Sequence, residues 1–84
     1  MSQIPTPPPR IFTVEWDAGR RKFVALDDGR ALLGMSADRA SAIGSAIRGA
    51  NSACRINGCV AVKVLLQNGK YRTEYIAQPF FRRP

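Results

Sequence analysis

The stretch that comes nearest to a known ligand-binding motif runs from residue 27 to residue 41, with the sequence DDGRALLGMSADRAS. Gly29, Gly34 and the hydroxyl of Ser36 follow the spacing of a Walker-type phosphate-binding loop. That loop needs a lysine that reaches the outer phosphates, and Met35 occupies the position of this lysine. The apolar residues between the two glycines also favour regular structure over an open loop of backbone amides. We therefore interpret the stretch as a tight turn that leads into a helix.

The residue types on which most catalytic and metal sites depend are scarce. The chain has no histidine, so it cannot form a Ser-His or Cys-His pair. A zinc site takes about four ligands, and only Cys54 and Cys59 are available. We expect these to be two small thiols where a helix leads into a strand, and leave a disulfide between them open. The acidic residues have structural explanations in turns, caps and cross-strand pairs. The sequence predicts a protein that is not an enzyme and has no metal or other cofactor.

The charge of the chain is its most informative property. Ten arginines and three lysines stand against six acidic residues, which gives a net charge of +7. Arginine suits bidentate contact with phosphate or carboxylate groups, and a large positive charge attracts polyanions. The predicted partner is nucleic acid, either DNA or RNA. An acidic protein surface is the alternative.

The two ends of the chain differ in composition from the middle. Residues 1–10 contain four prolines and predict an extended, disordered arm. Residues 79–84, PFFRRP, form an aromatic and basic tail, which leaves residues 11–78 as one domain. The first residues do not resemble a signal peptide, and the longest apolar run, 60–66, is too short to cross a bilayer. We expect no membrane association and a cytoplasmic location.

Residues 11–26 alternate between apolar and polar side chains, which predicts a β-hairpin with its turn at Ala18-Gly19. This register places Val14 opposite Phe23, and Glu15 opposite Lys22. Beyond Gly34 the period becomes helical, with Ser36 as the expected N-cap and an end between Gly49 and Cys54. The predicted apolar side of the helix comprises Ala40, Ile43, Ile47, Ala50 and Cys54.

The last hairpin has the strongest signal, because Asn68-Gly69 separates two alternating runs. A two-residue turn would pair Leu66 with Tyr71, Val64 with Thr73, and Val62 with Tyr75. The predicted fold class is α+β, a single β-β-α-β-β domain with an antiparallel-dominated sheet of four or five strands and one helix packed on one face. The fifth strand, over residues 31–34 with Leu32 facing the core, is left open.

The strand count decides which basic residues share an end of the molecule. With four strands, the helix returns to the first turn and brings Arg55, Arg82 and Arg83 to it. With five strands, Arg20, Arg21 and Lys22 share an end with Lys70, and Arg55 lies at the opposite end. In both versions the aromatic side chains are expected under the helix: Phe12, Trp16, Phe23, Tyr71 and Tyr75.

We therefore expect a non-catalytic basic module that contacts the phosphate backbone of nucleic acid with little sequence readout. The predicted nucleic-acid-binding residues are Arg20, Arg21, Lys22, Arg48, Arg55, Lys70, Arg72, Arg82 and Arg83. The alternative is an inhibitor or adaptor that docks on a protein through the outward sheet face and the tail. Its partner-binding residues are Leu65 and Ile76, in an outward patch that also holds Ile11, Val24 and Leu26, and Phe80 and Phe81 of the tail, which could also fold over this patch. A homodimer formed through this patch remains open.

Overall fold

The computed structural model describes residues 10–57 and 59–78, together with the side chains of all of these except residues 55–57. In chain order the elements are β1 (Arg10–Asp17), β2 (Lys22–Leu26), β3 (Leu32–Ser36), α1 (Arg39–Asn57), β4 (Val60–Leu65) and β5 (Tyr71–Ala77). The α+β class is confirmed, in its five-stranded version. Residues 1–9 and the tail with Phe80, Phe81, Arg82 and Arg83 lie outside the described residues.

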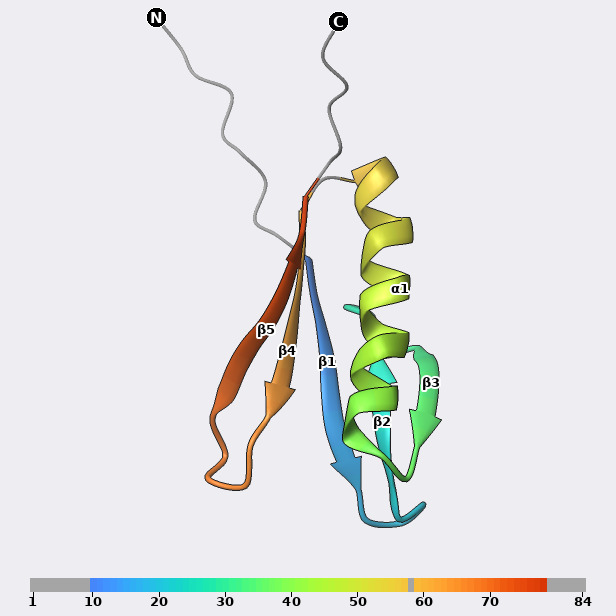
Figure 1. Ribbon diagram of the computed structural model, residues 1–84, viewed down its shortest axis with the longest axis vertical. Helices are drawn as coiled ribbons and strands as arrows, with labels where there is room; N and C mark the ends of the chain where they lie inside the picture. The colour runs from blue at the N-terminus through green and yellow to red at the C-terminus, as the bar shows by residue number, and fades with distance from the viewer. Residues whose placement is uncertain (1–9, 58, 79–84) are drawn as a thin grey trace, which may run out of the picture.

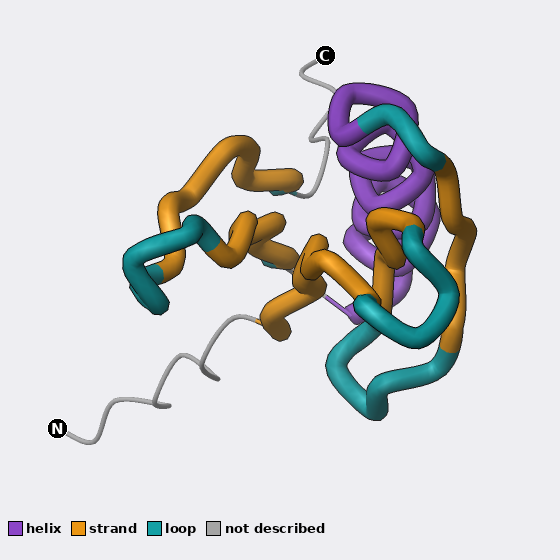
Figure 2. The backbone as a smooth tube through the Cα atoms, turned by 90° about the horizontal axis from the view of Figure 1, so that it is seen from below, coloured by secondary structure: helices purple, strands orange, loops and turns teal. Residues whose placement is uncertain are grey.

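The sheet is mixed, with the strand order β3-β2-β1-β4-β5. Neighbouring strands are antiparallel except for the central pair, β1 and β4, which run parallel. Three elements separate these two strands in sequence. Each element from β2 to β4 runs opposite to the one before it, so β4 runs parallel to β1 (Figure 1). Seen from below, α1 lies along one side of the curved sheet (Figure 2). The domain therefore has two layers, and the helix crosses over the sheet from the edge strand β3 to the central strand β4.

The core fills the layer between α1 and the sheet. Phe12, Val14, Val60, Val62 and Val64 supply its largest fully buried side chains. The helix meets them with small residues, Ala42, Ala46, Ala50 and Cys54. This row differs from the predicted one, because Ile43 and Ile47 flank it half-buried and Ala40 is exposed. Small side chains let the helix lie close to the bulky β-branched strand residues, so the row of alanines faces the sheet.

Both ends of the helix differ from the prediction. Asp38, and not Ser36, is the N-cap, since its Oδ2 accepts the backbone N–H of Ser41 at 3.0 Å. The helix continues to Asn57, beyond the predicted end. The Tyr75 hydroxyl donates to Asn51 Oδ1 at 2.8 Å and thereby ties the later turns to β5. Tertiary contacts thus outweigh the low helix propensity of the small and polar residues there.

The first hairpin has a longer turn than predicted. Asp17 pairs with Lys22, Trp16 with Phe23, and Val14 with Ala25, so residues 18–21 form the turn. Asp17 Oδ1 accepts the backbone N–H of Arg20 at 3.0 Å, and Arg21 takes a left-handed φ of 56°. The register is shifted by two residues, which leaves every side chain of β2 on its predicted face.

The last hairpin departs from the prediction in a way that moves a tyrosine. Leu66 and Lys70 close a three-residue turn in which Gly69 has a φ of 83°. Tyr71 consequently pairs with Leu65 and points to the outer face of the sheet, so its predicted burial under the helix was wrong. A bulge next to Val62 restores the predicted pairing of Val62 with Tyr75.

Strand β3 pairs with β2 through Phe23–Ser36 and Ala25–Gly34, followed by a bulge after Ala25. The bulge turns Leu32 outward, where it is 45% exposed, so its predicted place in the core was wrong. Leu33 instead covers α1 at Gly49, where an added Cβ would lie 3.1 Å from Leu33 Cδ1. β3 is therefore the fifth strand, and it directs Leu33, instead of the predicted Leu32, to the helix.

Three connections meet at one end of the molecule, which we call the turn end. They are the β1–β2 turn, the β3–α1 connection and the β4–β5 turn, all at the bottom of Figure 1. Arg20, Arg21 and Lys22 therefore share this end with Lys70, and the backbone of Arg55 lies toward the other end, as the five-stranded version predicted. None of the helices in the described residues is long and apolar enough to cross a membrane.

Candidate functional site

The basic residues divide into two groups according to whether a carboxylate binds them. Four arginines form ion pairs: Arg20 with Asp17 at 2.8 Å, Arg10 with Asp28 at 2.8 Å, Arg30 with Glu15 at 3.0 Å, and Arg72 with Glu74. The pair of Arg30 with Glu15 is part of a contact between separate parts of the sheet. Arg30, from the β2–β3 loop, and Tyr71, from β5, both donate to Glu15 of β1 across the outer face. We therefore assign the paired arginines a structural role.

The pKa values of Glu15, Asp17 and Asp28 are lowered, so these carboxylates are held in their charged form. Hydrogen bonds from Arg30 hold the pKa of Glu15 below its ordinary value, and Arg10 does the same for Asp28. The pKa of Asp17 is lowered first by the backbone N–H of Arg20. The other two acids serve the backbone, because Asp27 Oδ1 accepts two N–H groups of its own turn and Asp38 caps α1. All six acidic side chains are therefore engaged in the fold.

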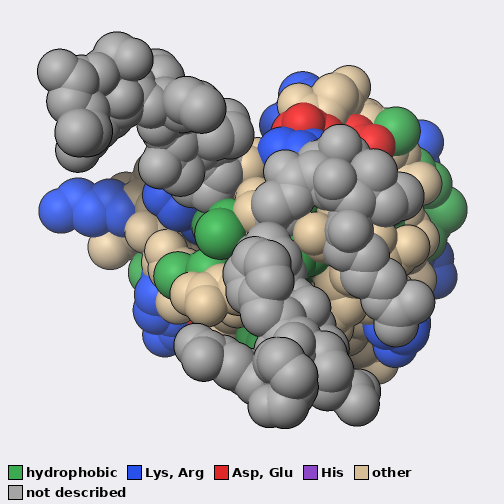
Figure 3. Space-filling model, turned by 90° about the horizontal axis from the view of Figure 1, so that it is seen from above, with side chains coloured by type: hydrophobic (Ala, Val, Ile, Leu, Met, Phe, Trp, Pro, Cys, Tyr) green, Lys and Arg blue, Asp and Glu red, His purple; other side chains and the backbone are tan. Residues whose placement is uncertain are grey.

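Six basic side chains among the described residues have no carboxylate within ion-pair distance: Arg21, Lys22, Arg39, Arg48, Lys63 and Lys70. Four of them lie at the turn end, on its two turns and at the first residue of α1. Arg48 lies further along the helix, where it donates to Ser45 Oγ, and Lys63 lies in the middle of β4. From above, toward the opposite end, the visible acidic side chains gather mainly at one place beside basic ones (Figure 3).

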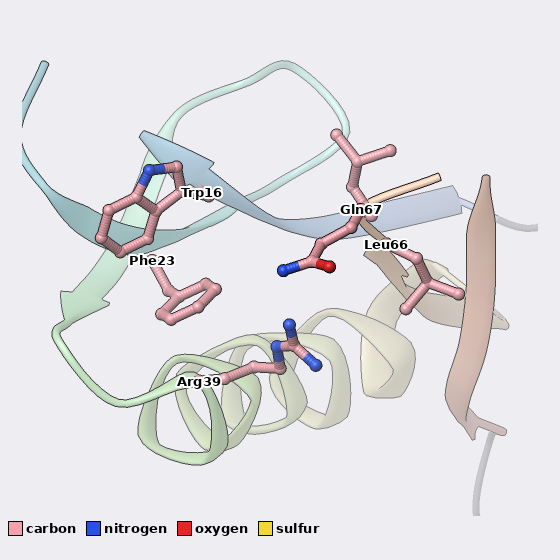
Figure 4. Close-up of a pocket in the computed structure, with 6 residues that line it drawn as sticks. Trp16, Phe23, Arg39, Leu66 and Gln67 are labelled. Carbon is pink, nitrogen blue, oxygen red and sulfur yellow. The ribbon is translucent and has the colours of Figure 1, made fainter. Parts of the chain in front are cut away.

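An open cleft of about 360 Å³ lies at the turn end, with Arg39 among the residues that line it. Its walls are two aromatic residues, one arginine and three residues that lead into the last hairpin turn: Trp16, Phe23, Arg39, Leu65, Leu66 and Gln67. Arg39 and Gln67 point toward each other across the middle of the cleft, with the aromatic rings on one side and Leu66 on the other (Figure 4). Asn68 continues the same surface into the turn.

The cleft exists because the two central strands separate. The pairing of β1 with β4 ends at Val14–Val64, although β1 continues to Asp17 beside β2. Beyond that pair, β1 and the segment after β4 diverge, as Figure 1 shows for β1 and the β4–β5 hairpin. Trp16 lies on the first of these two segments and Leu66 on the second. The aromatic residues at this end are therefore covered from one side only.

Trp16 corrects a prediction. Although it lies on the same face of β1 as Phe12 and Val14, it is 52% exposed, so the expected full cover by the helix was wrong. The helix begins only at Arg39, and its first turn reaches Phe23 but leaves the indole open. The Trp16 and Phe23 rings meet edge to face, with centroids 4.9 Å apart and a 67° interplanar angle. Arg39 places its guanidinium carbon 5.3 Å from the centre of the Phe23 ring.

The chemistry of the cleft suits binding. Its lining offers an exposed aromatic face, a guanidinium, a side-chain amide and aliphatic walls, with no carboxylate among the residues that form it. The residues with described side chains include no cluster of three or more potential metal ligands. An anion or a flat ring system matches this set of groups better than a reaction that needs acid–base catalysis.

The structure brings together only part of the predicted site. Arg20, Arg21, Lys22 and Lys70 lie at the turn end, and Arg72 follows in β5 opposite Val64, on the same face of the sheet as Trp16. Arg48 lies further along the helix, and the side chain of Arg55 is outside the described atoms. Leu65 contributes to the cleft wall. Ile76 remains on the outer face, 53% exposed and beside the buried Ala61.

Sequence reasoning missed Trp16, Phe23, Arg39, Leu66 and Gln67 as site residues. Their only signal is position, because each lies within four residues of a turn or a helix start. Comparison with known proteins finds no matching family model, no matching curated protein and no matching solved structure. The function must therefore be argued from the site itself.

Proposed function

We propose that this protein is a non-catalytic, cytoplasmic nucleic-acid-binding module that contacts the phosphate backbone through the residues of its turn end. Arg39 lies within the cleft. Arg21 and Lys22 precede the lining residue Phe23, and Lys70 follows the lining residue Gln67 in the β4–β5 turn. Cations without a carboxylate partner are available for phosphate, whereas a paired arginine must first lose its partner. This clustering of available cations at one end is the observation that carries the proposal.

A charge-matched pair of variants tests whether the turn end does the binding. The first variant carries Arg21→Asn, Lys22→Gln and Lys70→Gln; asparagine tolerates the left-handed φ at position 21. The second carries Arg48→Gln, Arg55→Gln and Lys63→Gln, which removes the same charge from positions outside the turn end. Affinity for a fluorescently labelled oligonucleotide is measured by anisotropy over a range of salt concentrations.

We expect the turn-end variant to bind at least roughly tenfold more weakly at low salt, and the control variant to change by less than about threefold. Each lost phosphate contact should also reduce the slope of log K against log salt by about 0.7 for a single strand and 0.9 for a duplex. Equal weakening in both variants would mean that net charge alone attracts the polyanion. Absence of measurable binding by the wild-type protein would reject the proposed function.

A second candidate is docking on a protein through the outer sheet face. Ile11 and Ile76 both flank the buried Ala61 in register and are 40% and 53% exposed, so they form a small apolar patch away from the cleft. A protein partner held there would bind with little dependence on salt, and Ile11→Ser with Ile76→Ser would abolish the interaction while the turn-end variant would not.

A further inference from the structure

The cleft offers more than a cluster of charge, because its main wall is an indole ring that the fold leaves uncovered. Trp16 is the single tryptophan of the chain and is 52% exposed. Exposure of half of so large an apolar side chain forgoes the stabilisation of burying it. The strand is rigidly placed, since Trp16 pairs with Phe23 in the β1–β2 ladder and packs edge to face on its ring. The ring is thus presented at a fixed position in the opening of the cleft.

The polar groups in the cleft complement a base and its phosphates. Arg39 supplies a planar guanidinium with several donors, and its contact with the Phe23 ring holds it on that side of the cleft. Gln67 supplies both a donor pair and an acceptor, so it can hydrogen-bond the edge of any base. The lining contains no carboxylate that would repel a phosphate. Asp17 and Asp38, which adjoin the lining residues Trp16 and Arg39 in sequence, are engaged by Arg20 and by the cap of α1.

The volume of the cleft and its access to solvent agree with the binding of a base. A volume of about 360 Å³ is at the lower end of the range for small-molecule pockets, roughly 300–1,000 Å³. The residues that line the cleft come from the β1–β2 hairpin, the start of α1 and the segment that leads into the β4–β5 turn (Figure 4). Both turns lie at the same end of the molecule (Figure 1). A strand that places a base in the cleft would therefore have Arg21 and Lys22 on one side of it and Lys70 on the other.

We propose that the cleft accepts one unpaired nucleobase of a single-stranded nucleic acid, stacked on Trp16, while the flanking phosphates contact Arg39 and the cations of the two turns. This proposal rests on the proposed function and adds the class of ligand to it. Bases within a duplex are stacked on one another and cannot enter the cleft, whereas the bases of a single strand can. The predicted ligand is single-stranded DNA or RNA, bound without much preference for sequence because every base has a flat face.

The test compares oligo-dT, oligo-U and a mixed-sequence DNA duplex with the same number of phosphates. Because Trp16 is the only tryptophan, its fluorescence reports directly on the cleft. We expect oligo-dT and oligo-U to quench this fluorescence and to bind at least about tenfold more tightly than the duplex. Quenching by one of the two strands alone would assign the site to DNA or to RNA.

Trp16→Ala should weaken single-strand binding by roughly five- to 150-fold, the range that stacking of one base on an aromatic side chain contributes, and should leave duplex binding unchanged. Trp16→Phe should restore most of the affinity. Tyr71→Ala is the matched control, since Tyr71 is 48% exposed on the opposite face, and it should bind like the wild type. Binding of the variants is followed by anisotropy of labelled oligonucleotides, and far-UV circular dichroism establishes that each is folded.

The outcomes separate the two proposals. Single strands and duplex that bind equally, with no effect of Trp16→Ala and a strong effect of the turn-end variant, would overturn base stacking and leave phosphate binding in place. A wild-type protein that binds neither ligand would overturn both. A loss of affinity in Trp16→Ala that Trp16→Phe does not restore would also contradict stacking, because phenylalanine offers an aromatic face as well.

Discussion

The same face of the sheet is closed over most of its length and open at one end. In the closed part, Ala42, Ala46 and Ala50 pack so closely on the strands that none of the three is accessible to solvent. In the cleft, Trp16 on the same face of β1 is half exposed. The two regions differ because the central strands are paired in the first and diverge beyond Val14–Val64 in the second. Strand pairing, and not the size or polarity of the residues, decides where this layer closes.

The distribution of charge follows the same division. On the outer face, Arg30 is tied to Glu15 across strands, and at the β2–β3 turn Arg10 is tied to Asp28. Around the cleft, Arg21, Lys22 and Lys70 have no such partner among the described residues. Residues of the same kind thus hold the fold together in one region and remain available to a ligand in the other. Substitutions should accordingly separate stability from binding.

The largest contrast is expected between two aromatic residues on one face of one strand. Phe12 is 2% exposed in the closed part, and Phe12→Ala should lower the free energy of unfolding by about 3–5 kcal/mol. Trp16→Ala should cost only about 1–2 kcal/mol, because half of the ring is already in water. Urea unfolding followed by far-UV circular dichroism measures both. The loss at Phe12 would be a large part of the stability of a domain of this size.

Phe12→Leu is the second variant if Phe12→Ala does not fold. It should remain folded and bind oligonucleotides as the wild type does, since Phe12 is not among the residues that line the cleft. Equal losses of stability at positions 12 and 16 would show that the open end contributes to the core as the closed part does. That result would contradict the distinction between the two regions.

A smaller effect is expected where α1 lies closest to β3. A Cβ added at Gly34 would lie 2.6 Å from Ser45 Oγ and 2.9 Å from Ser45 Cβ. Rotation of the serine relieves the first contact but not the second, so Gly34→Ala should destabilise the protein by about 1–3 kcal/mol. Gly44→Ala is the control within the helix, because its nearest atom, Arg48 Nη1, would be an ordinary 3.5 Å away. It should stabilise the protein by about 0.5–1 kcal/mol.

Both glycine variants are measured by thermal and urea unfolding, with oligonucleotide affinity as the second readout. Neither position borders the cleft, so affinity should be unchanged in both. A Gly34→Ala protein as stable as the wild type would mean that the helix is free to move away from β3, and the layer would not be closed in the sense described above.

Local patterns predicted much of the fold. The alternation in β1 and β2, the Asn68-Gly69 turn and the helical period after Gly34 all gave elements of the right type. Registers were less accurate, because side-chain hydrogen bonds and left-handed residues set the turn lengths. The hydrogen bond from the backbone N–H of Arg20 to Asp17 makes the β1–β2 turn two residues longer than predicted, and Gly69 makes the β4–β5 turn one residue longer. An odd change moves side chains to the other face, which is why Tyr71 was misplaced and the first hairpin was not.

Of the candidate site, the sequence predicted only the basic residues around it. Runs such as Arg20-Arg21-Lys22 are visible in the sequence, and the five-stranded version placed them with Lys70. The cleft itself depends on where β1 and β4 stop pairing, which is a long-range contact between residues 14 and 64. No local pattern encodes that point. The exposure of Trp16 and the approach of Arg39 and Gln67 therefore became apparent only in three dimensions.

The central claim is that ligand binds in the open end of the layer and not on its outer face. Amide chemical-shift mapping by NMR, with ¹⁵N-labelled protein titrated with oligo-dT, tests this most directly. We predict that the largest shifts fall in residues 16–23, at Arg39 and in residues 65–70, together with the indole N–H of Trp16. Shifts concentrated instead around Ile11, Ala61 and Ile76, with the indole unmoved, would contradict the account.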